Sequence, residues 1–94
     1  MIRTAALALL LFLPAAAAAE CYADYKAKRE PPLRLHYGVI ALPDAACASR
    51  AVAAAEIAGR LRAAGWELLD VMTVFGPEGL AERQADAGAF FLRY

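Results

Sequence analysis

AAGWELLDV, residues 63 to 71, contains a glycine, the only tryptophan of the chain and an acidic residue inside an apolar run. Gly65 is predicted to be the C′ residue that ends a helix, because this position usually adopts a left-handed backbone that glycine takes up at little cost. Trp66 follows as an anchor over the helix end. From Trp66 to Phe75 the side chains alternate between two faces, which predicts a strand. The quoted stretch therefore marks the boundary between a helix and a strand.

Upstream of this boundary, residues 45 to 64 are predicted to form the helix. Pro43 breaks the preceding segment and Asp44 is a favourable N-cap. Glu56 and Arg60 are spaced to form an i,i+4 ion pair on the solvent side. At 100 degrees per residue, one stripe of mostly small residues faces inward: Cys47, Ala51, Ala54, Ile57, Ala58 and Leu61. This amphipathic helix is expected to pack closely on a sheet.

Two further strands are predicted, one on each side of these elements. Residues 33 to 42 alternate, and the face predicted to be core holds Leu33, Leu35, Tyr37, Val39 and Ala41. After the Gly-Pro-Glu-Gly turn at residues 76 to 79, residues 80 to 88 are expected to hold a short helical turn. Residues 89 to 94 are apolar on both faces, which is typical of a central strand.

The resulting fold class is α+β, with one helix on a three-stranded sheet in the order strand, helix, strand, strand. A right-handed crossover makes the first two strands parallel, and the last strand is placed between them, giving sheet order 1-3-2. One helix covers only one face. The other face would then carry an uncovered apolar patch, which predicts a homodimer or an unknown protein partner: Ile40, Leu42, Leu68, Met72 and Val74.

Residues 1 to 19 are predicted to be a secretory signal peptide, with Arg3 before an apolar run and small residues at Ala17 and Ala19. The apolar run is shorter than the roughly 20 residues needed to span a bilayer, so no stable membrane insertion of the mature chain is expected. Cys21 near the cleavage site suggests lipidation as an alternative, but Glu20 disfavours it. A periplasmic or secreted location follows. The rest divides into an irregular lead-in, residues 20 to 32, with its Pro31-Pro32 pair, and a small domain, residues 33 to 94.

Cys21 and Cys47 are the only cysteines, and export would place them in an oxidising compartment. We therefore predict a disulfide that closes a loop of about 26 residues and contributes roughly 3 to 4 kcal/mol. A domain this small needs such a constraint, because it buries only roughly 60 percent of its unfolded surface. A redox-active pair or two metal ligands are the weaker alternatives, since the spacing is not C-x-x-C and only one histidine is present.

The charge balance indicates no electrostatic partner. The whole chain has ten basic and ten acidic residues, and removal of residues 1 to 19 takes away only Arg3, which leaves a net charge near −1. A nucleic-acid binder would show a clustered basic excess, so nucleic acid is not expected as a partner. Scattered carboxylates give no ligand spacing for a metal, and Gly76-x-x-Gly79 lacks the lysine of a phosphate-binding loop. No metal or cofactor is predicted.

Few residues are candidates for chemistry. His36 could act as a general acid or base with Asp70 as its orienting carboxylate. The alternative for Asp70 is a structural ion pair with Arg34 or Arg93, and the alternative for His36 is an ordinary exposed strand histidine. A small-molecule pocket beside residues 76 to 88 is a third candidate site, with three lining residues: Trp66, Met72 and Phe75.

Two parts of the chain also resemble a family. Gly65, Trp66, Glu67, Leu68 and Leu69, followed by Phe90, Phe91, Leu92 and Arg93, are similar to small bacterial domains of unknown function with a Gly-Trp-Glu-Leu motif after a helix and an aromatic C-terminal strand. The resemblance covers residues 33 to 94 and implies one helix on a three-stranded sheet, with no established activity. This chain departs from the simplest members in its leader, its two cysteines and its longer connection at residues 76 to 88.

Together, these observations favour a small exported binding or accessory protein that acts through its sheet. A small-molecule binder and an enzyme that uses His36 and Asp70 are the alternatives.

Overall fold

The computed structural model describes residues 21–94, so the predicted signal peptide and Glu20 lie outside the described residues. Three strands and two helices follow one another along the described chain: β1 (Cys21–Arg29), β2 (Arg34–Leu42), α1 (Arg50–Ala63), β3 (Glu67–Phe75) and α2 (Ala81–Ala87). Short 3-10 turns occur at Asp44–Cys47, Pro77–Gly79 and Gly88–Phe90. The predicted α+β class is confirmed.

The sheet is antiparallel, and its order is β2-β1-β3. Two predictions are therefore wrong: the lead-in is not irregular, and the central strand is not residues 89 to 94. The central strand is β1, which pairs with β2 from Cys21↔Leu42 to Arg29↔Arg34 and with β3 from Tyr22↔Phe75 to Lys28↔Glu67. The predicted arrangement of two parallel outer strands around an antiparallel middle strand is correct, but a different segment fills the middle.

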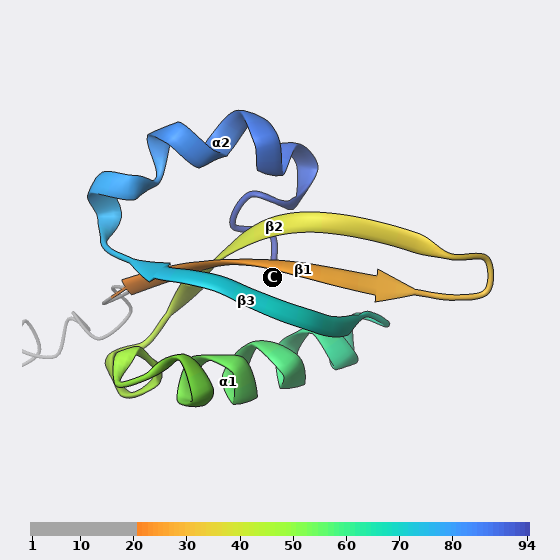
Figure 1. Ribbon diagram of the computed structural model, residues 1–94, viewed down its shortest axis with the longest axis horizontal. Helices are drawn as coiled ribbons and strands as arrows, with labels where there is room; N and C mark the ends of the chain where they lie inside the picture. The colour runs from red at the N-terminus through yellow and green to blue at the C-terminus, as the bar shows by residue number, and fades with distance from the viewer. Residues whose placement is uncertain (1–20) are drawn as a thin grey trace, which may run out of the picture.

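Two helices cover opposite faces of this sheet, and Figure 1 shows the sheet between α1 and α2. On the face toward α1, the core combines alternate residues of β1 with one side of the helix: Ala23, Tyr25, Ala27, Ala53, Ile57 and Leu61. On the face toward α2, Arg83 of the helix reaches Asp24 of β1. We call these the α1 face and the α2 face.

Helix α1 begins later than predicted. Residues Asp44–Cys47 form a separate 3-10 turn, and Ser49 is the N-cap, with its side-chain oxygen accepting a hydrogen bond of 3.1 Å from the amide of Val52. The buried side of α1 is formed by Ala53, Ile57 and Leu61, whereas Ala51, predicted to face inward, is exposed. The expected ion pair of Glu56 with Arg60 is present at 2.9 Å.

The two faces of β2 were assigned the wrong way round. Ile40 and Leu42, predicted to lie on the open face, are buried beneath α1. On the predicted core face, which is the α2 face, Val39 is buried, whereas Leu35 and the adjacent Leu33 are 65 % and 60 % exposed. Because α1 covers Ile40 and Leu42 and partly covers Leu68 and Val74, the large uncovered apolar patch does not form.

The C-terminal segment folds along the outer edge of β2. Phe91 makes an isolated parallel bridge with Val39, and the amide of Leu92 donates a hydrogen bond of 2.8 Å to the carbonyl oxygen of Val39. The segment thereby runs from α2 past β2 to the α1 face, where Phe90 and Tyr94 pack against the core. The C-terminal segment is apolar on both sides because Phe91 lies along the edge of β2 whereas Phe90 and Tyr94 pack against the core on the α1 face.

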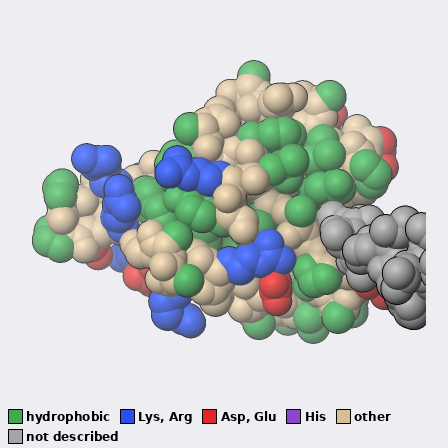
Figure 2. Space-filling view, turned by 180° about the vertical axis from the view of Figure 1, so that it is seen from behind, with side chains coloured by type: hydrophobic (Ala, Val, Ile, Leu, Met, Phe, Trp, Pro, Cys, Tyr) green, Lys and Arg blue, Asp and Glu red, His purple; other side chains and the backbone are tan. Residues whose placement is uncertain are grey.

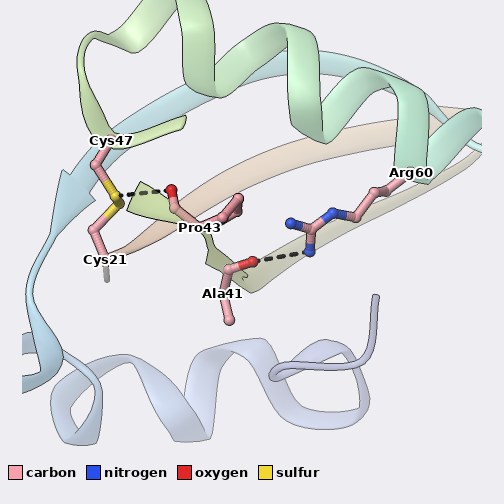
Figure 3. Close-up of a disulfide and its surroundings, with 5 residues drawn as sticks. All are labelled: Cys21, Ala41, Pro43, Cys47 and Arg60. Carbon is pink, nitrogen blue, oxygen red and sulfur yellow. Dashed lines mark hydrogen bonds between the residues drawn. A yellow bond between two sulfur atoms is a disulfide. The ribbon is translucent and has the colours of Figure 1, made fainter. Parts of the chain in front are cut away.

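The predicted disulfide between Cys21 and Cys47 is present. It joins the first residue of β1 to the 3-10 turn that precedes α1, as Figure 3 shows. Sγ of Cys47 packs 3.3 Å from the carbonyl oxygen of Pro43, and nearby the guanidinium of Arg60 donates a hydrogen bond of 2.8 Å to the carbonyl oxygen of Ala41. The disulfide thus joins the connection into α1 to the start of β1, and Arg60 joins the helix itself to the end of β2.

Candidate functional site: an aromatic cluster around His36

His36 lies inside a cluster of aromatic rings on the α1 face. Its ring stacks on Phe90 with 3.8 Å between centroids and meets Trp66 edge-on at 4.3 Å. Nε2 of His36 and the hydroxyl oxygen of Tyr25 share a hydrogen bond of 2.9 Å, and the histidine is only 8 % exposed. The prediction of an exposed strand histidine is therefore wrong, because the C-terminal segment covers it.

Local backbone features place these rings. Gly38 lies opposite Tyr25 in the β1–β2 register, and a Cβ at Gly38 would overlap the phenol ring, so the glycine allows this ring to lie across β2. Gly65 has a φ of 88°, as predicted for the residue that ends α1. The amide of Trp66 then donates a hydrogen bond of 2.9 Å to the carbonyl oxygen of Leu61, which fixes the indole over the helix end.

Two arginines stand over the aromatic rings. The guanidinium carbon of Arg29 lies 4.4 Å from the Trp66 ring centroid, and that of Arg93 lies 5.5 Å from the Phe90 centroid. Burial, together with the smaller effect of the positive charges of Arg29 and Arg93, lowers the pKa of His36 to about 4. Burial also raises the pKa of the Tyr25 hydroxyl. At neutral pH the histidine and the tyrosine are both uncharged.

Comparisons with protein families, curated proteins and solved structures found no match for this chain. The resemblance carried by the Gly-Trp-Glu-Leu motif therefore stays an expectation.

The predicted pairing of His36 with Asp70 does not occur. His36 lies opposite Ala27, whereas Asp70 lies opposite Lys26, and neighbouring residues of β1 point to opposite faces of the sheet. Among residues 21–94, Asp70 forms no salt bridge, so the alternative ion pair with Arg34 or Arg93 does not form either. Without an orienting carboxylate, His36 has no partner that would hold it as a general base at neutral pH.

The residues predicted to line a small-molecule pocket lie apart. Trp66 precedes the first residue of β3 and belongs to the His36 cluster. Phe75 is the last residue of β3, where its ring stacks with Tyr22 at 6.2 Å and lies beneath the guanidinium of Arg83 at 4.0 Å. Met72 is 37 % exposed on the strand between them. The three side chains therefore do not line one pocket.

A polar cluster on the α2 face was not predicted from the sequence. Asp24 is buried, and its Oδ2 accepts hydrogen bonds from the Tyr37 hydroxyl at 2.8 Å and from Nε of Arg83 at 3.1 Å. Burial and the bond to Asp24 raise the pKa of Tyr37 to about 12. This cluster joins α2 to β1 and β2, so its role is to hold α2 against the sheet. The signal was an aspartate within a segment whose alternation predicts a strand.

Two cavities lie near Trp66. An open groove of about 740 Å³ runs between α1 and the start of β3, and both apolar and charged residues line it: Ala54, Ala55, Ala58, Arg62, Trp66, Glu67 and Leu68. A smaller pocket of about 260 Å³ is also lined by Trp66, together with Arg29 and Arg93. Within residues 21–94, no cluster of three or more histidine, cysteine or acidic side chains could hold a metal ion. In the same part of the chain, no helix is long and apolar enough to cross a membrane.

Proposed function

We propose that this chain is a small exported binding or accessory protein without enzymatic activity, and that it acts as a homodimer joined through the outer edge of β3. Export is supported by the disulfide between Cys21 and Cys47, which is a bond typical of oxidising compartments, together with the leader-like pattern of residues 1 to 19. The neutral, carboxylate-free His36 supports a role in binding rather than catalysis.

The observation that carries the dimer is the outer edge of β3, where the carbonyl oxygen of Met72 accepts a hydrogen bond of 3.2 Å from Arg50 of α1. Among residues 21–94, no strand pairs with this edge, whereas the edge of β2 is partly covered by Phe91 and Leu92. Two large apolar side chains on β3 are also exposed, Leu69 at 49 % and Met72 at 37 %. A nine-residue edge of this kind is a site at which another strand can add, and proteins usually cover or charge such an edge.

The sequence of β3 complements itself in the antiparallel direction. A two-fold axis at Val71 is the only one that brings all nine residues from Glu67 to Phe75 opposite one another; the ladder of β3 with β1 is irregular at Leu69 and Met72, which have no paired residue in β1. It places Leu68 opposite Val74 twice, and it places Asp70 opposite Met72 and Glu67 opposite Phe75. No carboxylate then faces another carboxylate, so the repulsion that like charges cause across a strand pair is avoided. A second copy is therefore the occupant that this edge favours.

The neighbouring surface of α1 supports the same arrangement. Ala54, Ala55 and Ala58 line the groove of about 740 Å³ beside β3. Side chains this small allow a second α1 to approach closely when two sheets join edge to edge. The helix contact adds apolar area to the strand pairing, and a stable interface buries about 1,200 Å² or more in total.

Charge substitutions at Met72 test this proposal. Sedimentation equilibrium of the oxidised protein purified from its exported fraction should give twice the monomer mass. Met72→Glu places a carboxylate opposite Asp70 at two symmetric positions. At about 0.2 to 1 kcal/mol for each like-charge pair, the dimer dissociation constant should rise roughly 2- to 30-fold. Met72→Lys, which instead offers an opposite charge, should leave the dimer intact.

Leu35→Glu is the matched control, because it introduces the same charge at an exposed apolar position on β2, away from the β3 edge. This variant should dimerise as the wild type does. A monomeric wild type at all concentrations contradicts the proposal. Equal weakening by glutamate and lysine at Met72 contradicts the register centred on Val71.

A further inference from the structure

The small pocket beside Trp66 has an unusual combination of walls. It is an open pocket of about 260 Å³, lined by residues from the end of β1, the end of α1 and the C-terminal segment: Arg29, Ala64, Trp66, Phe90, Arg93 and Tyr94. Three of these residues are aromatic and two are arginines. The volume is slightly below the usual range for ligand sites, so only a small molecule fits.

Neither arginine of the pocket has a hydrogen-bond acceptor from the protein among residues 21–94. Their guanidinium groups instead contact aromatic rings, Arg29 over Trp66 and Arg93 over Phe90 and Tyr94. Some basic side chains in this part of the chain bond to protein oxygen atoms, as Arg60 does to Glu56 and Arg83 to Asp24. Arg29 and Arg93 differ from the remaining basic residues in lying together beside the aromatic rings of one pocket. A guanidinium has five N–H donors, so each pocket arginine keeps its donors available to a ligand.

Nearby acidic residues do not neutralise these two arginines. Glu30 is adjacent to Arg29 in sequence but forms its salt bridge with Lys28, at 3.0 Å. Glu67 also raises the pKa of Lys28 through its charge, after the larger effect of Glu30. The pocket therefore has two positive charges and no salt bridge to a carboxylate of the described chain.

We propose that this pocket binds a small organic carboxylate, with the carboxylate held by Arg29 and Arg93 and its planar or apolar body against the rings of Trp66, Phe90 and Tyr94. A guanidinium binds a carboxylate through two parallel N–H···O bonds, which fixes its orientation. Inorganic phosphate could use the arginines but has no apolar part to contact the aromatic rings of the pocket. The site is separate from the β3 edge, so it does not depend on the dimer.

Benzoate is a suitable probe, and the indole N–H signal of Trp66 is a suitable reporter, because Trp66 is the only tryptophan of the chain. In an NMR titration of the oxidised protein, benzoate should shift this signal in a saturable manner. Benzamide, which has the same ring without the charge, should not saturate. Inorganic phosphate should bind at least ten-fold more weakly than benzoate, because it makes no ring contact.

Substitutions of single arginines make the test specific. Arg29→Gln and Arg93→Gln should each weaken benzoate binding at least ten-fold, since each removes a charged hydrogen-bond donor. Arg34→Gln is the matched control: Arg34 lies opposite Arg29 in the hairpin but does not line the pocket, and its variant should stay within two-fold of the wild type. The proposal is overturned by an unshifted indole signal, by equal binding of phosphate and benzoate, or by an equal loss in the Arg34 variant.

Discussion

Acidification is expected to destabilise this fold through its single histidine. His36 has a pKa lowered to about 4, first by burial and then by Arg29 and Arg93, whereas an unfolded histidine titrates near 6.5. Between these two values the unfolded chain binds a proton that the folded chain does not bind. The free energy of unfolding therefore falls as the pH is lowered from about 6.5 to about 4, and below that range His36 causes no further loss.

The size of this effect follows from the two pKa values. At 1.36 kcal/mol per pKa unit the full difference would be about 3 kcal/mol. His36 itself is only 8 % exposed, but Arg29 is exposed, so water screens part of the repulsion. We expect a loss on the order of 2 kcal/mol, which is a large share of the stability of a small domain.

Urea unfolding at pH 7 and pH 4.5 measures this loss. His36→Gln is the matched variant, because glutamine can both donate to and accept from the Tyr25 hydroxyl but does not titrate. The wild type should lose about 2 kcal/mol more than the variant, since the carboxylates contribute equally to both. Equal losses would refute the reasoning. A histidine NMR titration with its midpoint at or above pH 6 would also refute it.

Three further substitutions test the packing. Gly38→Ala should cost about 1 to 3 kcal/mol because its Cβ overlaps Tyr25, whereas Gly59→Ala, with open space around it in α1, should stabilise by up to about 1 kcal/mol; urea unfolding that shows no difference contradicts this account. Replacing both cysteines with serine should lower the free energy of unfolding by about 3.5 kcal/mol, the value for a loop of 26 residues, and thermal unfolding without reductant checks it; a loss below about 1 kcal/mol would be too small. Arg83→Met should cost about 2 to 3 kcal/mol by leaving Asp24 buried without its cation, and adding Asp24→Asn should recover part of this loss in a double-mutant cycle; strictly additive effects would exclude the coupling.

Local signals in the sequence predicted several elements well. The strands at residues 33 to 42 and 66 to 75 match β2 and β3 within one residue, and residues 80 to 88 contain α2 as expected. The disulfide followed from the number of cysteines and the expected compartment. These features depend on neighbouring residues or on a simple count, so tertiary contacts were not needed to find them.

The central strand was missed because its inward side chains are weak hydrophobic signals. Cys21, Ala23, Tyr25 and Ala27 do alternate with polar residues, but two of the four are alanines, and the following Pro31-Pro32 suggested an irregular segment. Alanine is suited to this place because helix and aromatic side chains cover it from above. Whether alanine packs well in β1 depends on side chains that are distant in sequence.

The candidate site could be predicted only in part, for a related reason. His36 and Trp66 were identified, but Phe90 and Tyr94 were assigned to a strand because their neighbourhood is apolar on both sides. The segment instead passes the edge of β2 and contacts two layers. Periodicity within a few residues does not distinguish a strand covered on both faces from a segment that crosses an edge.

The position of β1 has a consequence for the order of folding. It is the first strand in the sequence, yet it must pair with the last strand, Lys28 with Glu67 at one end of the ladder and Tyr22 with Phe75 at the other. The β1–β2 hairpin can form from local contacts, but the edge of β1 that pairs with β3 is exposed to solvent until β3 is in place. Closing that long loop is the slow step expected from contact order, so a newly emerged chain would spend its most aggregation-prone interval as an unfinished hairpin.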